Sequence, residues 1–213
     1  ALGVAQDGAL VLLAMAFTGE EKNTIFGWRS EDSGRTWQPV DTSALADNQT
    51  GSVYGHVFPA GEHGLAVCGH YRKPSRPHEE GIWIAFSADH GKTWGAARRI
   101  TSELLNEPAV VYTADRFIGL FRETRRQLPR SWYWQAVSDD GQTWRVEPGA
   151  LANDRKLLQP SPFLTVDPND PNRLYALQSM RGVGEATKGR IYLWTADARR
   201  LDWRRLGLVA ALP

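Results

Sequence analysis

Stretches in which apolar and polar side chains alternate run along almost the whole chain. This alternation is typical of β-strands with one buried face, and no segment shows convincing helical periodicity. The pattern therefore predicts an all-β protein. The stretches that carry it are residues 10–17, 24–28, 64–69, 81–86, 109–112, 117–121, 132–136, 173–178 and 190–194.

A short motif recurs after several of these stretches. Its first two copies read Ser-Glu-Asp-Ser-Gly-Arg-Thr-Trp at residues 30–37 and Ser-Ala-Asp-His-Gly-Lys-Thr-Trp at residues 87–94. The third reads Val-Ser-Asp-Asp-Gly-Gln-Thr-Trp at residues 137–144, and a degenerate fourth runs from Thr195 to Trp203 without the glycine. The shared positions of the three full copies are Asp32, Gly34, Trp37, Asp89, Gly91, Trp94, Asp139, Gly141 and Trp144.

Each copy of the motif predicts the tip of a β-hairpin. Its aspartate accepts hydrogen bonds from nearby backbone N–H groups, and its glycine supplies the positive φ that a tight turn needs. The threonine resumes the strand, and the tryptophan folds beneath the turn and buries its ring. The aspartates, with Asp197 in the fourth copy, are 57, 50 and 58 residues apart. That spacing leaves room for about four short strands per repeat, which is one β-propeller blade.

The repeats divide the chain into four expected blades of a single domain that spans residues 1–213. The approximate bounds of the blades are residues 1–50, 51–103, 104–151 and 152–213. Open sheet edges pair readily with other strands. We therefore expect the chain either to associate with itself or to be completed by further blades.

Composition narrows the partners of the chain. It has 213 residues, and 25 Lys and Arg stand against 24 Asp and Glu, so the formal net charge of +1 argues against a nucleic-acid partner. The longest apolar run, residues 9–17, is too short to span a bilayer and lacks the basic leader of a signal peptide, so no membrane partner is expected. The single cysteine, Cys68, lies in an apolar stretch and is interpreted as a small buried hydrophobe. The histidines show no metal-ligand spacing, and no cofactor is expected.

The motif copies resemble the Asp boxes, or BNR repeats, of the sialidase (neuraminidase) superfamily. The resemblance covers essentially the whole chain. It implies a β-propeller of the six-bladed sialidase type, with about four blades of four antiparallel strands present here. In that family the Asp boxes lie at the blade periphery, away from the active site, and they also occur in proteins that are not enzymes. The motif residues are therefore expected to be structural.

A second segment resembles the central part of these enzymes. Asn106-Glu107-Pro108 leads into a hydrophobic strand, a turn and a second strand that ends in Arg122. The resemblance implies that Glu107 polarises a tyrosine nucleophile and that Arg122 belongs to a triad of arginines that grips the substrate carboxylate. The chemistry is consistent, because a guanidinium binds a carboxylate through two parallel hydrogen bonds and a carboxylate can take the proton of a phenol. An ordinary ion pair at a strand edge is the alternative.

The other groups of such a site match less well. The third arginine of the triad is expected at Arg190, with Arg181 as a weaker choice, and either is alternatively a solvated residue at a blade edge. The first arginine would precede Ala1, and the tyrosine nucleophile would follow Pro213. No aspartate stands where the acid/base is expected, although Glu20 or Glu21 could replace it. We therefore expect that this polypeptide alone does not run the complete reaction and is a fragment or a divergent relative.

Two functions follow from the resemblance and from these differences. The first is a sialidase-like propeller that acts on terminal sialic acids as an exo-sialidase, or a divergent or incomplete relative of one, with an acidic sugar or glycan as its partner. The alternative is a non-catalytic glycan-binding or structural propeller module of a secreted or virion surface protein. The single cysteine leaves the compartment open, and this alternative favours a secreted, extracellular or virion-associated location.

Overall fold

The described part of the computed structural model is built almost entirely of β-strands. It comprises residues 1–19, 22–45, 51–71, 81–123, 133–151, 159–181 and 189–211. Within these residues the strands form four sheets of four antiparallel strands, and each sheet follows the order of the sequence. The all-β prediction is confirmed, and each sheet has the architecture of a propeller blade. No helix among these residues is long and apolar enough to cross a membrane.

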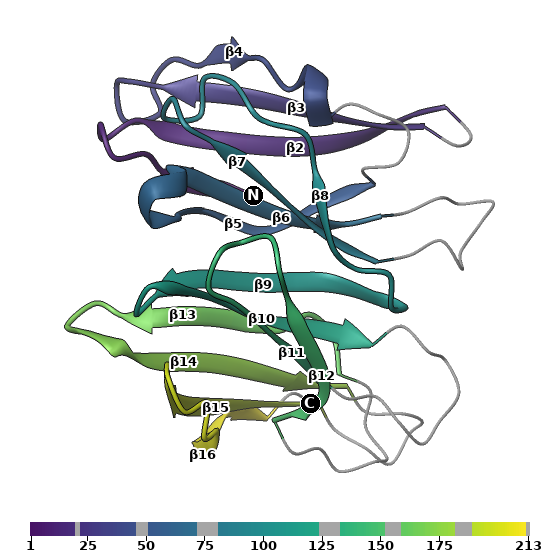
Figure 1. Cartoon of the computed structure of the whole chain (residues 1–213), viewed down its shortest axis with the longest axis vertical. Helices are drawn as coiled ribbons and strands as arrows, with labels where there is room; N and C mark the ends of the chain where they lie inside the picture. Colours follow the sequence, from purple (N-terminus) through teal and green to yellow (C-terminus); the bar gives the residue numbers. More distant parts are fainter. Residues whose placement is uncertain are drawn as a thin grey trace. The chain divides into compact units, whose positions relative to one another are not determined.

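The chain forms two compact units, residues 1–106 and 107–213, which are described separately (Figure 1). The strands of the first unit, with two short 3-10 helices, are β1 (Leu2–Val4), β2 (Leu10–Gly19), β3 (Lys22–Ser30), β4 (Gln38–Val40), η1 (Ser43–Leu45), β5 (Ser52–Pro59), η2 (Gly61–His63), β6 (Leu65–His70), β7 (Ile82–Ser87) and β8 (Arg98–Thr101). The strands of the second are β9, which begins just before the boundary (Leu105–Thr113), β10 (Arg116–Glu123), β11 (Tyr133–Ser138), β12 (Arg145–Ala150), β13 (Phe163–Asp167), β14 (Asp170–Met180), β15 (Arg190–Asp197) and β16 (Arg204–Ala211).

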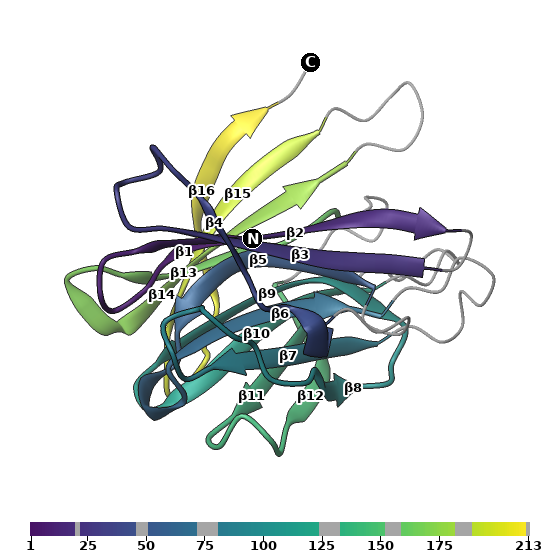
Figure 2. The same ribbon diagram turned by 90° about the horizontal axis from the view of Figure 1, so that it is seen from above.

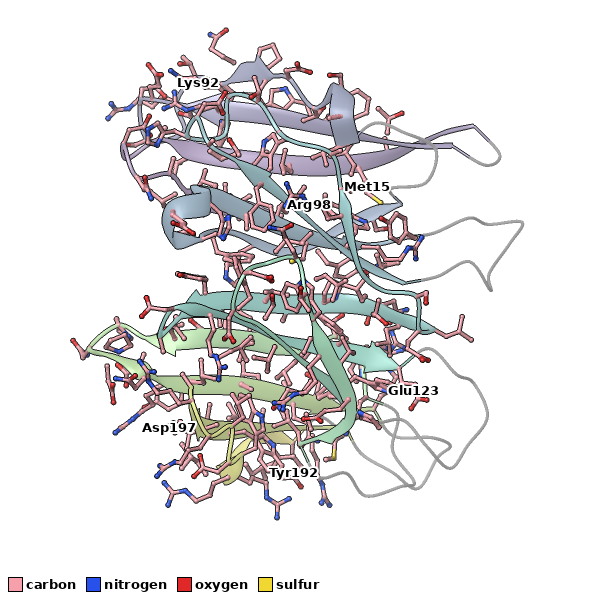
Figure 3. The ribbon with its side chains drawn as sticks, in the orientation of Figure 1. Met15, Lys92, Arg98, Glu123, Tyr192 and Asp197 are labelled. Atoms are coloured by element: carbon pink, nitrogen blue, oxygen red, sulfur yellow. The ribbon has the colours of Figure 1, made fainter. Side chains whose placement is uncertain are left out.

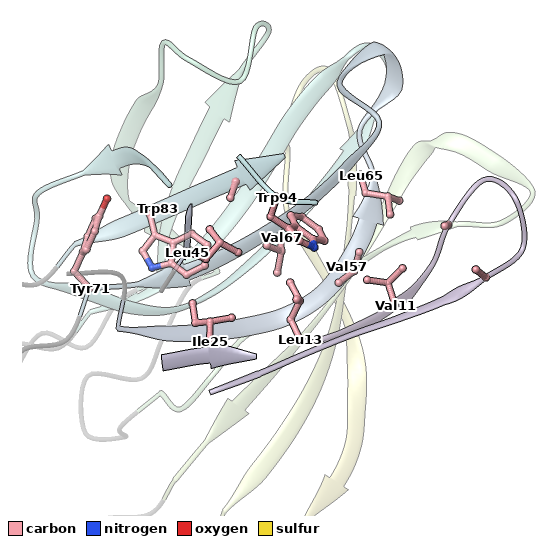
Figure 4. Packing of buried hydrophobic residues seen from close by; sticks show 13 residues of the cluster. Val11, Leu13, Ile25, Leu45, Val57, Leu65, Val67, Tyr71, Trp83 and Trp94 are labelled. Carbon is pink, nitrogen blue, oxygen red and sulfur yellow. The ribbon is translucent and has the colours of Figure 1, made fainter. Parts of the chain in front are cut away.

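The core of the first unit lies between its two sheets. Because side chains alternate along a strand, Val11 and Leu13 of β2 lie on the same face, and they pack against Val67 and Trp83 of the second sheet (Figure 4). The second motif turn also contacts the first sheet. A Cβ on Gly91, which has a φ of 83°, would lie 2.7 Å from a methyl carbon of Val11. Only glycine fits this close approach. Figure 2 shows β2 and β3 lying side by side as one long hairpin.

The core of the second unit is built in the same way. Ile118 and Leu120 of β10 pack with Leu174 of β14 and Trp194 of β15 in one buried cluster between the two sheets. Gln178 is fully buried there and accepts a hydrogen bond of 2.9 Å from the indole N–H of Trp194. Its amide also donates to the carbonyl of Leu151 at 3.3 Å. The polar side chain inside this core is therefore hydrogen-bonded, as burial requires.

The first two motif turns share one set of hydrogen bonds. In the first, Asp32 Oδ1 accepts from Ser30 Oγ and from the backbone N–H of Thr36, both at 2.8 Å. Asp89 makes the equivalent bonds in the second turn at 2.8 and 2.9 Å. The hydrogen bonds from backbone and hydroxyl donors hold the pKa of Asp32 down at about 2. The predicted role of the aspartate as an acceptor from backbone N–H groups is present in both turns.

The third turn uses a different aspartate from the one that the motif alignment assigned. Asp140, not Asp139, accepts from Ser138 Oγ at 3.0 Å and from the backbone N–H of Thr143 at 2.7 Å. Asp139 instead forms an ion pair of 2.9 Å with Arg116. The reason is that this turn is one residue shorter, so the backbone N–H of Gly141 reaches the serine hydroxyl across three residues and not four.

The fourth turn forms without a glycine. Asp197 accepts from the backbone N–H groups of Arg199 and Arg200 at 3.0 and 2.9 Å. Leu201 has a φ of 56° and supplies the left-handed conformation that glycine provides in the other copies. An aspartate with backbone donors is therefore enough to close this turn.

The motif tryptophans are buried less uniformly than the sequence predicts. Trp94 is buried, whereas Trp37, Trp144 and Trp203 keep part of their surface exposed. The difference follows from position, because Trp94 is part of the core cluster between the two sheets of the first unit. Cys68 is also buried, as predicted, and burial raises the pKa of its thiol.

Candidate functional site

The candidate residues of the second unit lie at the sheet end opposite the motif turns. In each antiparallel sheet of this unit the motif turn lies at one end. At the other end β10 and β14 end and β11 and β15 begin, and we call this end the loop edge. Figure 3 shows Glu123, at the end of β10, and Asp197, at the fourth turn, on opposite sides of this unit. The resemblance implies that the active site lies away from the Asp boxes, and the loop edge lies at the end of the sheets opposite the motif turns.

A tight hairpin brings the two central candidates together. Ala114 and Asp115 connect β9 to β10, and both have a positive φ, 51° and 60°, as a two-residue turn of type I′ requires. Counting back from this turn, residues 107 and 122 face each other across the hairpin. Arg122 Nη1 donates to Glu107 Oε2 at 2.7 Å. The side chains are 29% and 16% exposed, so the pair is shielded but reachable from solvent.

The backbone at Glu107 is unusual for its sequence. Its φ is 48°, in the left-handed region that residues other than glycine rarely adopt. Pro108 follows directly and normally favours an extended residue before it. Such a conformation costs about 1–3 kcal/mol and persists only where the surrounding structure imposes it. Backbone strain of this kind is typical of functional positions.

Arg122 faces the neighbouring sheet of its unit. It shares a face of β10 with Ile118 and Leu120, whose side chains pack between the two sheets. Arg190 begins β15 and shares a face with Trp194, which belongs to the same cluster. Arg122 of the third sheet and Arg190 of the fourth therefore both lie at the loop edge, each on the strand face that packs between the two sheets.

Of the remaining candidates, two arginines are exposed and two glutamates are not described. Arg190 is exposed, and its Nη1 donates to Tyr192 Oη at 3.3 Å. Arg181 is exposed and follows the last residue of β14. Glu20 and Glu21 lie outside the described residues.

A buried tyrosine that the sequence did not reveal lies beside the pair. Tyr133 begins β11, is paired in register with Arg122, and is fully buried. Its hydroxyl donates to the carbonyl of Pro160 at 2.5 Å. Burial raises its pKa well above the ordinary value for tyrosine, so the phenol stays protonated at neutral pH and is no nucleophile. The alternating pattern marks this residue as part of a strand, but nothing in the sequence marks its hydroxyl.

The arrangement has the chemistry of an anion-binding site. The guanidinium of Arg122 is planar and carries five N–H donors, and the bond to Glu107 uses one of its terminal nitrogens. Arg190 brings a second guanidinium to the same edge. Within the part of the chain that the structure describes, no group of three or more His, Cys, Asp or Glu side chains is placed to hold a metal ion.

Solved structures with similar folds include several glycosidases. One is an α-L-arabinofuranosidase from Fusarium graminearum in complex with an iminosugar inhibitor. It is 16% identical to this chain with a TM-score of 0.78, and the alignment covers 98% of this chain and 65% of the enzyme. A Hadza microbial sialidase is 18% identical with a TM-score of 0.62, over 96% of this chain and 45% of its own. An α-L-arabinofuranosidase from Lactobacillus brevis is 13% identical with a TM-score of 0.62, over 91% and 70%.

These proteins are longer than this chain, which spans 65% of the length of the Fusarium enzyme. At such low identity the likeness shows the fold. A comparison with curated protein sequences finds no match. The sequence matches the BNR repeat-like domain over residues 1–198, which is nearly the whole chain. The chain therefore belongs to the BNR repeat-like domain family.

Proposed function

We propose that this chain is the sugar-binding part of a sialidase-like glycoside hydrolase. Arg122 and Arg190 would grip the carboxylate of a terminal acidic sugar, and Glu107 would orient Arg122. The observation that carries the proposal is the Glu107–Arg122 ion pair of 2.7 Å, held at the loop edge by a glutamate with a φ of 48°. A structural ion pair needs no such backbone, because two extended strands already bring opposite charges into contact.

The roles of the residues follow from their chemistry. A guanidinium fork matches a carboxylate, and a second guanidinium from the neighbouring sheet adds charge without requiring the ligand to be buried. A negative charge at Glu107 keeps Arg122 in place when the site is empty. In the reaction of the sialidase superfamily such a glutamate also polarises a tyrosine phenol. The activity of the whole protein is part of the proposal, because the chain spans 65% of its longer relative.

The test is a direct measurement of binding and turnover with matched variants. The chain is titrated with sialic acid by calorimetry, and the whole protein is assayed with a fluorogenic sialoside. Arg122→Ala is expected to weaken binding by about 10- to 100-fold, the cost of a hydrogen bond to a charged group. The control is Arg116→Ala on the same strand, which removes an ion pair with Asp139 at the motif-turn end. It should change binding by less than about twofold.

Each outcome decides between the functions. Turnover that is lost in Glu107→Gln supports the hydrolase. Binding that depends on Arg122 without turnover supports a non-catalytic glycan-binding module. Failure of the wild type to bind or cleave an acidic sugar overturns the proposal.

A neutral pentose glycan is the second candidate. It is favoured by the TM-score of 0.78 with the Fusarium α-L-arabinofuranosidase. A furanoside without a carboxylate has no use for paired guanidinium groups. Hydrolysis of an aryl α-L-arabinofuranoside that persists in Arg122→Ala would support this candidate against the first.

A further inference from the structure

The hydroxyl of Tyr133 joins the two sheets of the second unit. The backbone of this residue lies in the third sheet, where β11 pairs it with Arg122 on one side and with Ala150 on the other. Its hydroxyl reaches the fourth sheet, where it donates to the carbonyl of Pro160 at 2.5 Å, just before β13. The backbone N–H of Ser179 on β14 also interacts with this hydroxyl, and the tyrosine belongs to the buried cluster that contains Leu174 of β14 and Trp194 of β15. One phenol therefore bridges both sheets.

The bridge ends next to Arg190. In the ladder between β14 and β15, Ser179 is paired with Ile191 and Met180 with Arg190. Ser179 therefore lies one ladder step from the pair that contains the arginine. At its other end, the same tyrosine is the ladder partner of Arg122.

The environment of the phenol makes the bridge specific. Tyr133 is fully buried, and a buried hydroxyl without partners is costly, so its hydrogen bond to Pro160 favours one separation of the sheets. Arg122 and Glu107 both interact electrostatically with the phenol. The bridge is therefore in the immediate surroundings of the ion pair.

We propose that Tyr133 is a positioning residue that fixes the spacing between Arg122 on the third sheet and Arg190 on the fourth. The inference rests on the proposed function, in which both arginines contact one carboxylate. Two guanidinium groups share a carboxylate only when their separation is held within a fraction of an ångström of the productive geometry. Tyr133 supplies this restraint from outside the site, without touching the sugar.

The first test compares two tyrosine-to-phenylalanine variants in the full chain. Tyr133→Phe removes the bridge and keeps the ring in the core. It is expected to weaken binding of sialic acid by about five- to tenfold. Tyr175→Phe is the matched control, because Tyr175 also lies on the fourth sheet and its hydroxyl donates to Asp167 at 3.2 Å, near the motif-turn end. It should change binding by less than about twofold.

A double-mutant cycle separates positioning from general stability. In the Arg190→Ala background, Tyr133→Phe should weaken binding by less than about twofold more, because the second arginine is already gone. An equal effect of Tyr133→Phe in both backgrounds overturns the proposal, as does unchanged binding in the single variant.

Hydrogen exchange tests the contact between Tyr133 and the fourth sheet without any ligand. Hydrogen exchange of the Ser179 amide should be about tenfold faster in Tyr133→Phe and unchanged in Tyr175→Phe. Unchanged exchange in both variants overturns the bridge. Faster exchange together with no binding of sialic acid by the wild type would instead overturn the proposed function and, with it, the positioning role.

Discussion

The backbone of Glu107 adopts an unfavourable conformation beside the guanidinium of Arg122, which is a group that can bind an anionic ligand. The left-handed φ of 48°, the proline that follows and the ion pair with Arg122 occur at one residue. Cost and interaction together suggest that the position is held for its side chain and not for the fold. If so, stability and binding should change in opposite directions when the side chain is removed.

Replacing Glu107 by glycine or alanine tests this idea at the residue scale. Both changes remove the ion pair, but only glycine adopts a φ of 48° without steric cost. We expect Glu107→Gly to have a free energy of unfolding about 1 kcal/mol higher than Glu107→Ala, the reverse of the usual order in strands. Urea unfolding of the two variants measures the difference. An Ala variant that equals or exceeds the Gly variant would contradict the left-handed backbone.

The sequence predicts part of this site and misses another part for a physical reason. Glu107 and Arg122 lie on two strands joined by a short turn, so their meeting follows from local hairpin geometry. Tyr133 meets Pro160 and Ser179 across two sheets. That contact depends on how sheets pack, which no periodicity records. Long-range hydrogen bonds of this kind are visible only in the folded chain.

At the scale of elements, the motif turns depend on a charged acceptor. Asp140 accepts from two backbone N–H groups and a hydroxyl, and these bonds lower its pKa to about 2. A group with a lowered native pKa stabilises the fold above its unfolded pKa of about 3.9. That contribution is lost as the pH falls through the native value.

The adjacent pair Asp139 and Asp140 provides a matched test. Asp140→Asn should lower the melting temperature at pH 7, because it removes charged hydrogen bonds that close the third turn. Asp139→Asn should have little effect, because this exposed residue only pairs with Arg116 at the surface. The deficit of Asp140→Asn should shrink from pH 4 downwards and vanish only below its native pKa of about 2, where the wild-type carboxyl is itself protonated. Thermal unfolding at several pH values checks this, and equal deficits in the two variants would refute the assignment.

The strands themselves were predicted unevenly. Strands such as β2, β7 and β15 were predicted from their apolar side chains, because one or both of their faces are buried. The outer strand β16 is exposed along almost its whole length, so burial imposes no pattern on its sequence. The outer strands β4, β8 and β12 are also largely exposed and were likewise missed. The third motif copy was assigned to Asp139 because this residue keeps the spacing to the glycine and the tryptophan, whereas Asp140 keeps the spacing to the serine and accepts the hydrogen bonds of the shorter turn.

At the scale of the whole molecule, two sheets have apolar side chains on both faces. In the first sheet, Val11 and Ile25 are buried on one face, while Phe26 lies 41% exposed on the other. In the fourth, Leu174 is buried on one face, and Phe163 is 50% exposed on the other, in register with Leu177. Exposed apolar faces of this kind favour association with another copy of the chain. That one domain spans residues 1–213 stays a prediction.

These faces predict self-association of the chain in isolation. The apparent mass in size-exclusion chromatography with light scattering should rise with protein concentration. Introducing lysine at both Phe26 and Phe163 should reduce this association without lowering the melting temperature. Gln38→Lys adds a charge at an exposed polar position of the first sheet and should leave association unchanged. A wild-type chain that stays monomeric at all concentrations would contradict the prediction.

The order of the strands has a consequence for how such a protein is made. In each sheet every strand pairs with its neighbours in sequence, so a sheet is one continuous piece of chain. Its ladder can therefore form during synthesis as soon as its last strand leaves the ribosome, before later sheets exist. A gene duplication or deletion that falls in the connections between sheets likewise breaks no ladder. Lineages can thus gain or lose whole sheets while the residues at the loop edge change independently.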